Sequence, residues 1–297
     1  MTTIQTTTPS VNEVELTAFG SGYGECTLIH LGQGEWMVVD SCVARDNRIP
    51  VLEYLDELGV DAGTAVKVVV ATHWHDDHIR GMSSVVRRCE SALFVLSAAL
   101  AGHEVFRGIA AIDSSTRLRK LSSGVRELRS TLDIVRRRGG TGARWAVEGR
   151  CVYQRDGRLP AAVYALSPAD RSVVASLQQI TQLITEGEDR RVAFPNRNLG
   201  AVALWVEVAG VRMLLGSDLQ ETANPETGWT AVIESRAWPG RAELFRVPCH
   251  GAANGHQVRV WQELLEDDAH AIVSPYQLGR VGEFHRSLHG TGHDGRP

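Results

Sequence analysis

One short stretch limits what this chain can be more than any other. The apolar run 66–71 has the length of a buried strand and leads, after Thr72, into His73-Trp74-His75-Asp76-Asp77-His78. A loop that leaves a buried strand is where binding and catalytic residues usually lie. The sequence therefore predicts a functional site at the edge of a sheet.

The side chains of this cluster are typical metal ligands. Neutral imidazoles and carboxylates bind Zn²⁺ and similar divalent ions. Four candidate ligands within six residues cannot all face a single ion, but they can serve two neighbouring ions. His73 and His75 would then bind one ion, and Asp77 and His78 the other. A surface loop without metal is the alternative, and so dense a cluster directly after a valine run argues against it.

The rest of the chain alternates between strand and helix patterns. Period-two or continuous apolar runs predict strands at 14–19, 26–31, 36–40, 66–71, 93–96, 145–154, 162–166, 202–208, 211–216 and 271–274. Helical spacing predicts helices at 50–59, 79–89, 121–138, 170–184 and 258–265. Two strand-rich halves, each closed by helices, predict one α/β domain over residues 14–286. Residues 1–13 and 287–297 are expected to be disordered tails.

Composition narrows the cellular setting. Five widely spaced cysteines without a Cys-x-x-Cys pair indicate free thiols in a reducing cytoplasm. The Thr-rich N-terminus lacks the features of a secretory signal, and no window approaches 18 uncharged apolar residues. We therefore expect a cytoplasmic protein with no membrane span.

Charge is unevenly distributed. The net charge is −4, yet residues 117–158 hold 12 Arg or Lys against 4 acids, which is +8 locally and −12 elsewhere. Such a segment can attract an anionic substrate such as nucleic acid or a nucleotide. A solvated helix face explains it equally well.

The string from Thr72 to His78 resembles the signature of the metallo-β-lactamase superfamily. Other landmarks follow in order: Asp40 after the strand 37–39, Asp218 in Gly216-Ser217-Asp218, and His250 in Pro248-Cys249-His250-Gly251. The resemblance implies a four-layer αββα sandwich, in which two mixed β-sheets pack face to face with helices outside. It also implies the metal ligands His73, His75, Asp77, His78, Asp218 and His250.

The same resemblance assigns roles to these residues. Asp218 would bridge the two ions, His250 would complete the site of His73 and His75, and Asp40 would orient ligands through hydrogen bonds. Asp77, Asp218 and His250 would also be the catalytic residues.

Three motifs resemble the ComEC-like branch, the hydrolase part of DNA-uptake proteins. They are Gly20-x-Gly22-x-Gly24-Glu25-Cys26, Asn198-x-x-Ala201-Val202-Ala203-Leu204 and Pro248-Cys249-His250-Gly251-Ala252. Cys249 replaces a histidine of that branch and is either a buried, unreactive thiol or a soft ligand. The branch also has a Gly-His-Pro that this chain lacks after Ser274-Pro275, so His285 is the candidate for that last ligand.

The resemblance implies a hydrolase with two divalent ions, Zn²⁺ or else Mn²⁺, and a hydroxide bridging them. A phosphodiesterase or nuclease is the first expectation. A lactone or thioester hydrolase is the alternative within the superfamily. A weakly catalytic metal-binding subunit of a larger assembly, such as a defence system, is the alternative from another class. The sequence does not indicate an oligomeric state.

Overall fold

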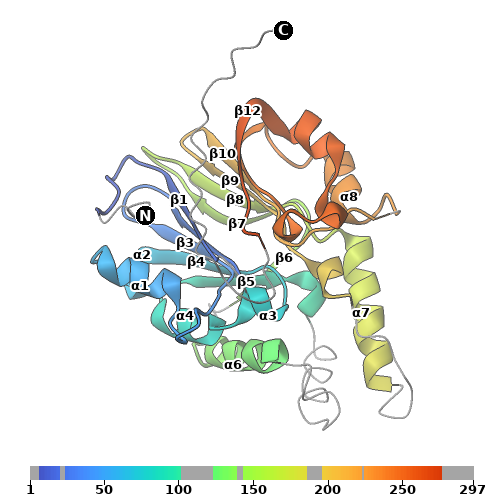
Figure 1. Cartoon of the computed structure of the whole chain (residues 1–297), viewed down its shortest axis with the longest axis horizontal. Helices are drawn as coiled ribbons and strands as arrows, with labels where there is room; N and C mark the ends of the chain where they lie inside the picture. Colours follow the sequence, from blue (N-terminus) through green and yellow to red (C-terminus); the bar gives the residue numbers. More distant parts are fainter. Residues whose placement is uncertain are drawn as a thin grey trace.

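The computed structural model describes residues 7–20, 24–101, 123–138, 143–185, 196–222 and 224–275. Two six-stranded mixed sheets pack face to face in it, and helices cover their outer faces (Figure 1). The expected four-layer αββα sandwich is confirmed. Residues 1–6 of the predicted N-terminal tail, the whole predicted C-terminal tail 287–297 and His285 lie outside the described residues.

The first sheet holds the N-terminal strands in chain order. Its strands are β1 (Glu15–Phe19), β2 (Cys26–His30), β3 (Trp36–Val39), β4 (Val66–Ala71), β5 (Leu93–Ser97) and β6 (Ala143–Ala146). From β1 to β3 the pairing is antiparallel, and from β3 to β6 it is parallel. The parallel strands β3, β4 and β5 therefore end at one edge, where a site can form.

The second sheet holds the remaining strands, again in chain order. Its strands are β7 (Arg150–Arg155), β8 (Ala161–Ala165), β9 (Leu204–Val208), β10 (Val211–Leu215), β11 (Ala242–Arg246) and β12 (Leu265–Ile272). From β7 to β10 the pairing is antiparallel, and from β10 to β12 it is parallel. This sheet thus repeats the antiparallel-then-parallel pattern of the first.

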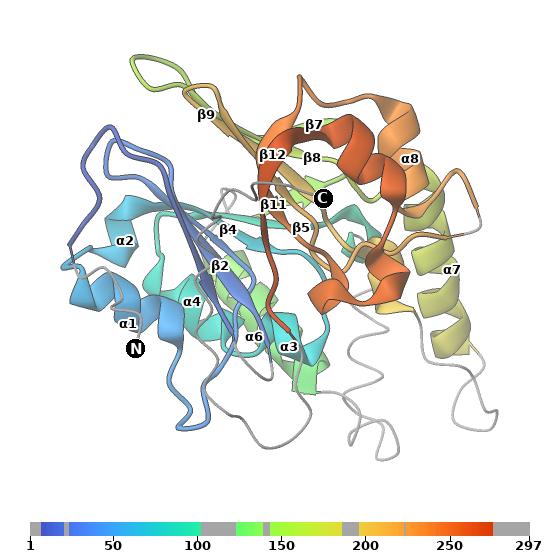
Figure 2. The same ribbon diagram turned by 45° about the horizontal axis from the view of Figure 1, so that its top comes forward.

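Alternation along the strands builds the layers. Val68 and Val70 of β4 pack in the core between the sheets, whereas Val69 and Ala71 pack in the core under the helices. On the first sheet lie α1 (Pro50–Glu57), α2 (Ala62–Ala65), α3 (Asp76–Ile79), α4 (Met82–Arg88) and α6 (Ser123–Arg137). The second half contributes α7 (Asp170–Thr185) and α8 (Gly228–Ser235), and α8 packs on the second sheet. Figure 2 shows α4 and α6 on one side of the sandwich and α8 on the other.

Three expected elements differ in the structure. The single strand expected at 145–154 is two strands in different sheets, because Gly149, with φ of 75°, turns the chain between β6 and β7. The helix expected at 258–265 is one π-helical turn, η6 (Val260–Leu264), and β12 begins directly after it rather than at 271. Pairing with β11 extends β12 over a polar stretch that has no strand pattern of its own.

No helix among the described residues is long and apolar enough to cross a bilayer.

Candidate metal centre

The predicted ligands meet where parallel strands of both sheets end. Asp40 follows β3, His73 follows β4, Asp218 follows β10 and His250 follows β11. Both sheets present the carboxyl ends of these strands at the same place, so residues far apart in sequence share one site.

The first donor group consists of His73, His75 and Asp218, whose ligand atoms lie within 4.8 Å of one another. His73 Nε2 is 2.9 Å from His75 Nδ1. Asp218 Oδ2 lies 3.6 Å from His73 Nε2 and 3.8 Å from His75 Nδ1. Two ring nitrogens and a carboxylate oxygen are therefore close enough together to bind one metal ion.

The second donor group consists of Asp77, His78 and His250, again within 4.8 Å. His250 Nε2 lies 3.2 Å from Asp77 Oδ2. The structure thus places His250 beside Asp77 and His78 and not, as expected, with His73 and His75. The chain after β12 accounts for this, because the Ser274 carbonyl binds His250 Nδ1 and holds the ring beside Asp77.

Asp218 lies between the two groups. Its Oδ1 is 3.4 Å from His78 Nε2, while its Oδ2 faces the first group. One carboxylate with an oxygen toward each group has the position expected of a bridging ligand.

The outer ring nitrogens are tied to acceptors. Asp40 accepts hydrogen bonds from Thr72 N, Thr72 Oγ1 and His78 Nδ1, each at 2.8 Å. Because the Thr72 hydroxyl donates to Asp40, it accepts from His73 Nδ1 at 3.0 Å. His250 Nδ1 donates to Ser274 O at 2.9 Å. These bonds hold the outer nitrogens, so that Nε2 of His73, His78 and His250 is directed inward, as metal-binding histidines require.

Several inward-facing atoms have no hydrogen-bond partner in the described part of the chain. They are His78 Nε2, Asp218 Oδ1 and Asn198 Oδ1, all buried. A buried polar group without a partner costs about 1–3 kcal/mol. A divalent ion between these groups would satisfy such atoms, so the residues present fit a metal.

The backbone is strained at the same strand ends. Asp40, Ser217, Cys249 and His250 have φ of 61°, 49°, 51° and 54°. Residues other than glycine rarely adopt this left-handed region, and strain of about 1–3 kcal/mol per residue accumulates mostly at functional sites. The strained backbone at these residues therefore lowers the stability of the fold but orients the side chains toward the centre.

The histidines differ in their affinity for protons. Burial, with His78 nearby, lowers the pKa of His73 to about 4. Burial also acts on His78, but Asp218 and Asp40 outweigh it and raise the pKa of His78 well above its ordinary value. The pKa of His250 is raised as well, since Asp77 and Glu25 outweigh burial.

The carboxylates of the centre stay ionised. Burial would raise the pKa of Asp77, but the hydrogen bond from His250 and the nearby His78 lower it to about 2. The three histidines around Asp218 lower its pKa far below the ordinary value, again against the effect of burial. The centre therefore presents anionic ligands over the whole physiological pH range.

An open cavity of about 570 Å³ gives access to the centre. It is lined by His75, Asp77, Asn198, Asp218, Cys249, His250, Gly251, Ala252, Asn254 and Pro275. This volume is sufficient for a small organic substrate.

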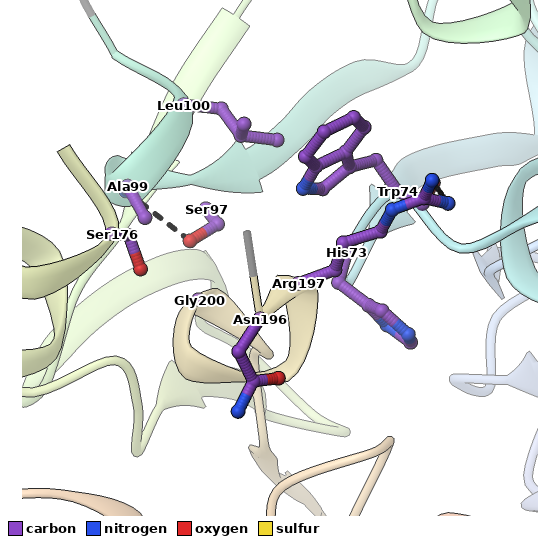
Figure 3. Close-up of a pocket in the computed structure, with 9 residues that line it drawn as sticks. All are labelled: His73, Trp74, Ser97, Ala99, Leu100, Ser176, Asn196, Arg197 and Gly200. Carbon is purple, nitrogen blue, oxygen red and sulfur yellow. Dashed lines mark hydrogen bonds between the residues drawn. The ribbon is translucent and has the colours of Figure 1, made fainter. Parts of the chain in front are cut away.

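A second cavity behind His73 is too small for a substrate. Figure 3 shows it between Trp74, Ser97 and Arg197, and its volume is about 10 Å³, roughly one water molecule. The Arg197 guanidinium lies 4.5 Å from the Trp74 ring centroid and donates to the Trp74 carbonyl. The packing of Arg197 on Trp74 therefore supports the ligand loop 73–78 on the side away from the large cavity.

Two neighbours of the ligands have structural roles. Cys249 is buried, and burial together with Asp218 and Glu25 raises the pKa of its thiol. It belongs to neither donor group, which favours the unreactive thiol over the soft ligand. Asp76 points away from the ligands and accepts hydrogen bonds from Ser123 and Gly124, so it caps the start of α6.

The basic segment does not line the cavity in the part that the structure describes. Arg138 and Arg144 donate to backbone carbonyls, and Arg155 is paired with Glu35. Arg136 and Arg137 lie in the last turn of α6, whose first turn is the one that contacts the ligand loop. Attraction of an anionic substrate by this segment stays a prediction.

Comparison with protein-family models gives a match to part of the chain. A family model described as the metallo-beta-lactamase superfamily matches residues 20–102, which contain Asp40 and the cluster from His73 to His78. No curated protein matches significantly.

Three solved structures illustrate the similarity. The metallo-beta-lactamase fold protein YhfI from Bacillus subtilis is 13% identical, with 80% of this chain and 72% of that chain covered and a TM-score of 0.39. A putative metallo-beta-lactamase from Thermotoga maritima is 14% identical, with 69% and 78% covered and a TM-score of 0.38. Metallo-beta-lactamase SMB-1, bound to 2-mercaptoethanesulfonate, is 15% identical, with 76% and 71% covered and a TM-score of 0.40.

The family match over residues 20–102 and the two-sheet architecture agree on the metallo-β-lactamase fold, and the site is a candidate centre for divalent metal.

Proposed function

We propose that this chain is a metal-dependent hydrolase that cleaves phosphodiesters with two divalent ions. The arrangement of the donors carries the proposal. Two groups of three ligands share Asp218 between them, and three of the four histidines direct Nε2 inward. His73, His75 and Asp218 would hold one ion, and Asp77, His78, His250 and Asp218 the other.

Two ions held in this way would lower the pKa of a coordinated water to about 7 and stabilise charge on a phosphoryl oxygen. Mixed imidazole and carboxylate ligands suit Zn²⁺, with Mn²⁺ as the alternative. The chain's own residues keep the ligands in place: Asp40 fixes the tautomer of His78 directly and that of His73 through Thr72. A protein nucleophile is not required, which agrees with the raised pKa of Cys249.

The substrate class rests on the three ComEC-like motifs. Two of them supply residues that line the cavity, Asn198 and His250. The third contains Glu25, whose backbone N–H donates to the Asp77 carbonyl at 2.8 Å. A phosphodiester of nucleic acid, a nucleotide or a lipid headgroup fits this proposal.

A phosphodiester assay with a matched control tests it. Wild type, reconstituted with Zn²⁺ or Mn²⁺, is expected to hydrolyse bis-p-nitrophenyl phosphate or DNA. The double variant His75→Ala/Asp77→Ala removes one ligand from each group and is expected to lose activity by about 100-fold or more. The control His256→Ala/Asp267→Ala removes the same residue types at exposed positions and keeps the activity. Equal rates in all three proteins would contradict the proposal.

One observation favours the alternative of lactone or thioester hydrolysis. No Arg or Lys is among the described residues that line the cavity, so within them an anionic substrate would find the amides of Asn198 and Asn254 but no cationic side chain beside the ions. Turnover of lactone or thioester panels without turnover of phosphodiesters would establish this alternative. Fewer than two ions per chain and no turnover of any substrate would instead indicate the metal-binding subunit.

A further inference from the structure

A buried ion pair lies beneath the second donor group. Arg246, the last residue of β11, is 2% exposed, and Glu25, directly before β2, is 5% exposed. Arg246 Nη2 donates to Glu25 Oε2 at 2.7 Å. Burying two charges costs about as much as their attraction returns, and apolar residues often serve stability equally well. The pair therefore needs a reason other than stability.

The pair is connected to His250. Arg246 Nη2 also donates to Ser274 Oγ at 2.6 Å, and its Nη1 donates to Ile272 O at 3.2 Å. Ser274 O accepts from His250 Nδ1 at 2.9 Å, and Glu25 Oε2 lies 3.4 Å from the same nitrogen. Arg246 thus holds both acceptors that face the outer nitrogen of His250.

The pair is also connected to Asp77. Glu25 N donates to Asp77 O at 2.8 Å. Gly24 makes this approach possible, since a Cβ at its φ of 107° would lie 2.8 Å from Asp77 O. Glu25 therefore contacts the backbone of one ligand and the ring of another. Within the described residues, the hydrogen bonds of Glu25 and Arg246 reach neither His73 nor His75.

From this geometry we infer that Glu25 and Arg246 are positioning residues that set the affinity of the second donor group for its ion. The inference rests on the proposed two-metal site. It predicts a selective effect: weakening the pair loosens the ion at Asp77, His78 and His250 and leaves the ion at His73 and His75 bound. A purely structural pair would weaken both ions equally or neither.

Stepwise metal affinity, measured by competition with a chromophoric chelator, tests the inference. The double variant Glu25→Gln/Arg246→Met removes both charges together, which avoids leaving one buried alone. Glu35→Gln/Arg155→Met is the matched control, because that pair also joins an Arg and a Glu, at 2.6 Å against 2.7 Å, but lies elsewhere. His75→Ala and Asp77→Ala show which binding step belongs to which group.

In Glu25→Gln/Arg246→Met we expect the affinity for the second ion to fall by about 10–100-fold, with the first ion and the control unchanged. Ser274→Ala removes only the hydroxyl that accepts a hydrogen bond from Arg246, and we expect a smaller loss of affinity for the second ion. It also tests the inference if the double variant does not fold. Unchanged affinities, or equal losses at both steps, would overturn the inference. A wild type that binds fewer than two ions would instead overturn the proposed function.

Discussion

At the scale of single residues, the centre depends on how each histidine is oriented. Asp40 and Thr72 determine which nitrogen of His73 and His78 faces the candidate metal sites. Asp218 then joins the two donor groups, because it has one oxygen toward each. Its loss should therefore affect both ions, whereas loss of any histidine should affect one.

Asp218→Ala is expected to reduce bound metal from two ions to fewer than one per chain, with phosphodiesterase activity lower by about 100-fold or more. Elemental analysis of the purified variant measures this. Asp267→Ala, which removes a carboxylate that is 95% exposed, is the control. Two ions retained in Asp218→Ala would show that this carboxylate is not a ligand.

Gly24→Ala should damage the site without replacing a ligand. The added Cβ would lie 2.8 Å from both Asp77 O and Cys42 Cβ, at a φ of 107° that alanine avoids. We expect a loss of about 2–3 kcal/mol in the free energy of unfolding, measured with denaturant, and weaker binding of the second ion. Gly34→Ala is the control with positive φ, since nothing lies within 4 Å of the added carbon. Equal losses in both variants would assign the effect to backbone strain alone.

At the scale of elements, the sequence predicts strands well where the pattern is local. The apolar run before Thr72 is sufficient to predict β4, and the spacing from His73 to His78 is sufficient to identify four candidate ligands. The split between β6 and β7 was missed because it depends on which sheet each strand joins. Glu25 and Arg246 were not assigned a role because they are 221 residues apart. A charge inside the apolar run 244–247 is the local signal that could have indicated Arg246.

Arg155 of β7 fastens the two sheets together at their other end. It donates to Leu31 O and Gly32 O, in the turn between β2 and β3, and pairs with Glu35. Burial would raise the pKa of Glu35, but the hydrogen bonds from Tyr153 and Arg155 lower it below the ordinary 4.5. Ionised Glu35 therefore stabilises the fold above pH 4.5, and this contribution is lost as pH falls through the lowered pKa.

Glu35→Gln is accordingly expected to cost about 1–2 kcal/mol at pH 7. The difference from wild type should shrink below pH 4.5 and vanish once Glu35 is protonated in the folded protein. Urea unfolding from pH 3 to pH 8 measures it. A difference that stays constant across this range would mean that the charge of Glu35 contributes nothing.

At the scale of the whole molecule, each donor group draws on both sheets. The first combines His73 and His75 with Asp218, and the second combines Asp77 and His78 with His250. Bound ions would therefore cross-link the two halves of the sandwich.

Removal of metal should lower the stability of the entire fold. An ion at 100 times its Kd stabilises the folded state by about 2.7 kcal/mol, so two such ions contribute about 5 kcal/mol. A change of about 1 kcal/mol shifts Tm by roughly 2–4 °C in a domain of about 150–250 residues. EDTA treatment is thus expected to lower Tm by roughly 10 °C or more, and calorimetry with added Zn²⁺ should restore it. His75→Ala/Asp77→Ala should show a smaller shift, and a Tm insensitive to EDTA in wild type would contradict binding across the sheets.

The separation of the ligands along the chain has a kinetic consequence. Asp77 and His250 are 173 residues apart, yet their side chains touch. Contacts between such distant segments require closure of a long loop, so they form late in folding. The cluster from His73 to His78 leaves the ribosome well before Asp218 and His250 exist. Both donor groups are therefore complete only once the two sheets have docked, so capture of both ions would report that docking.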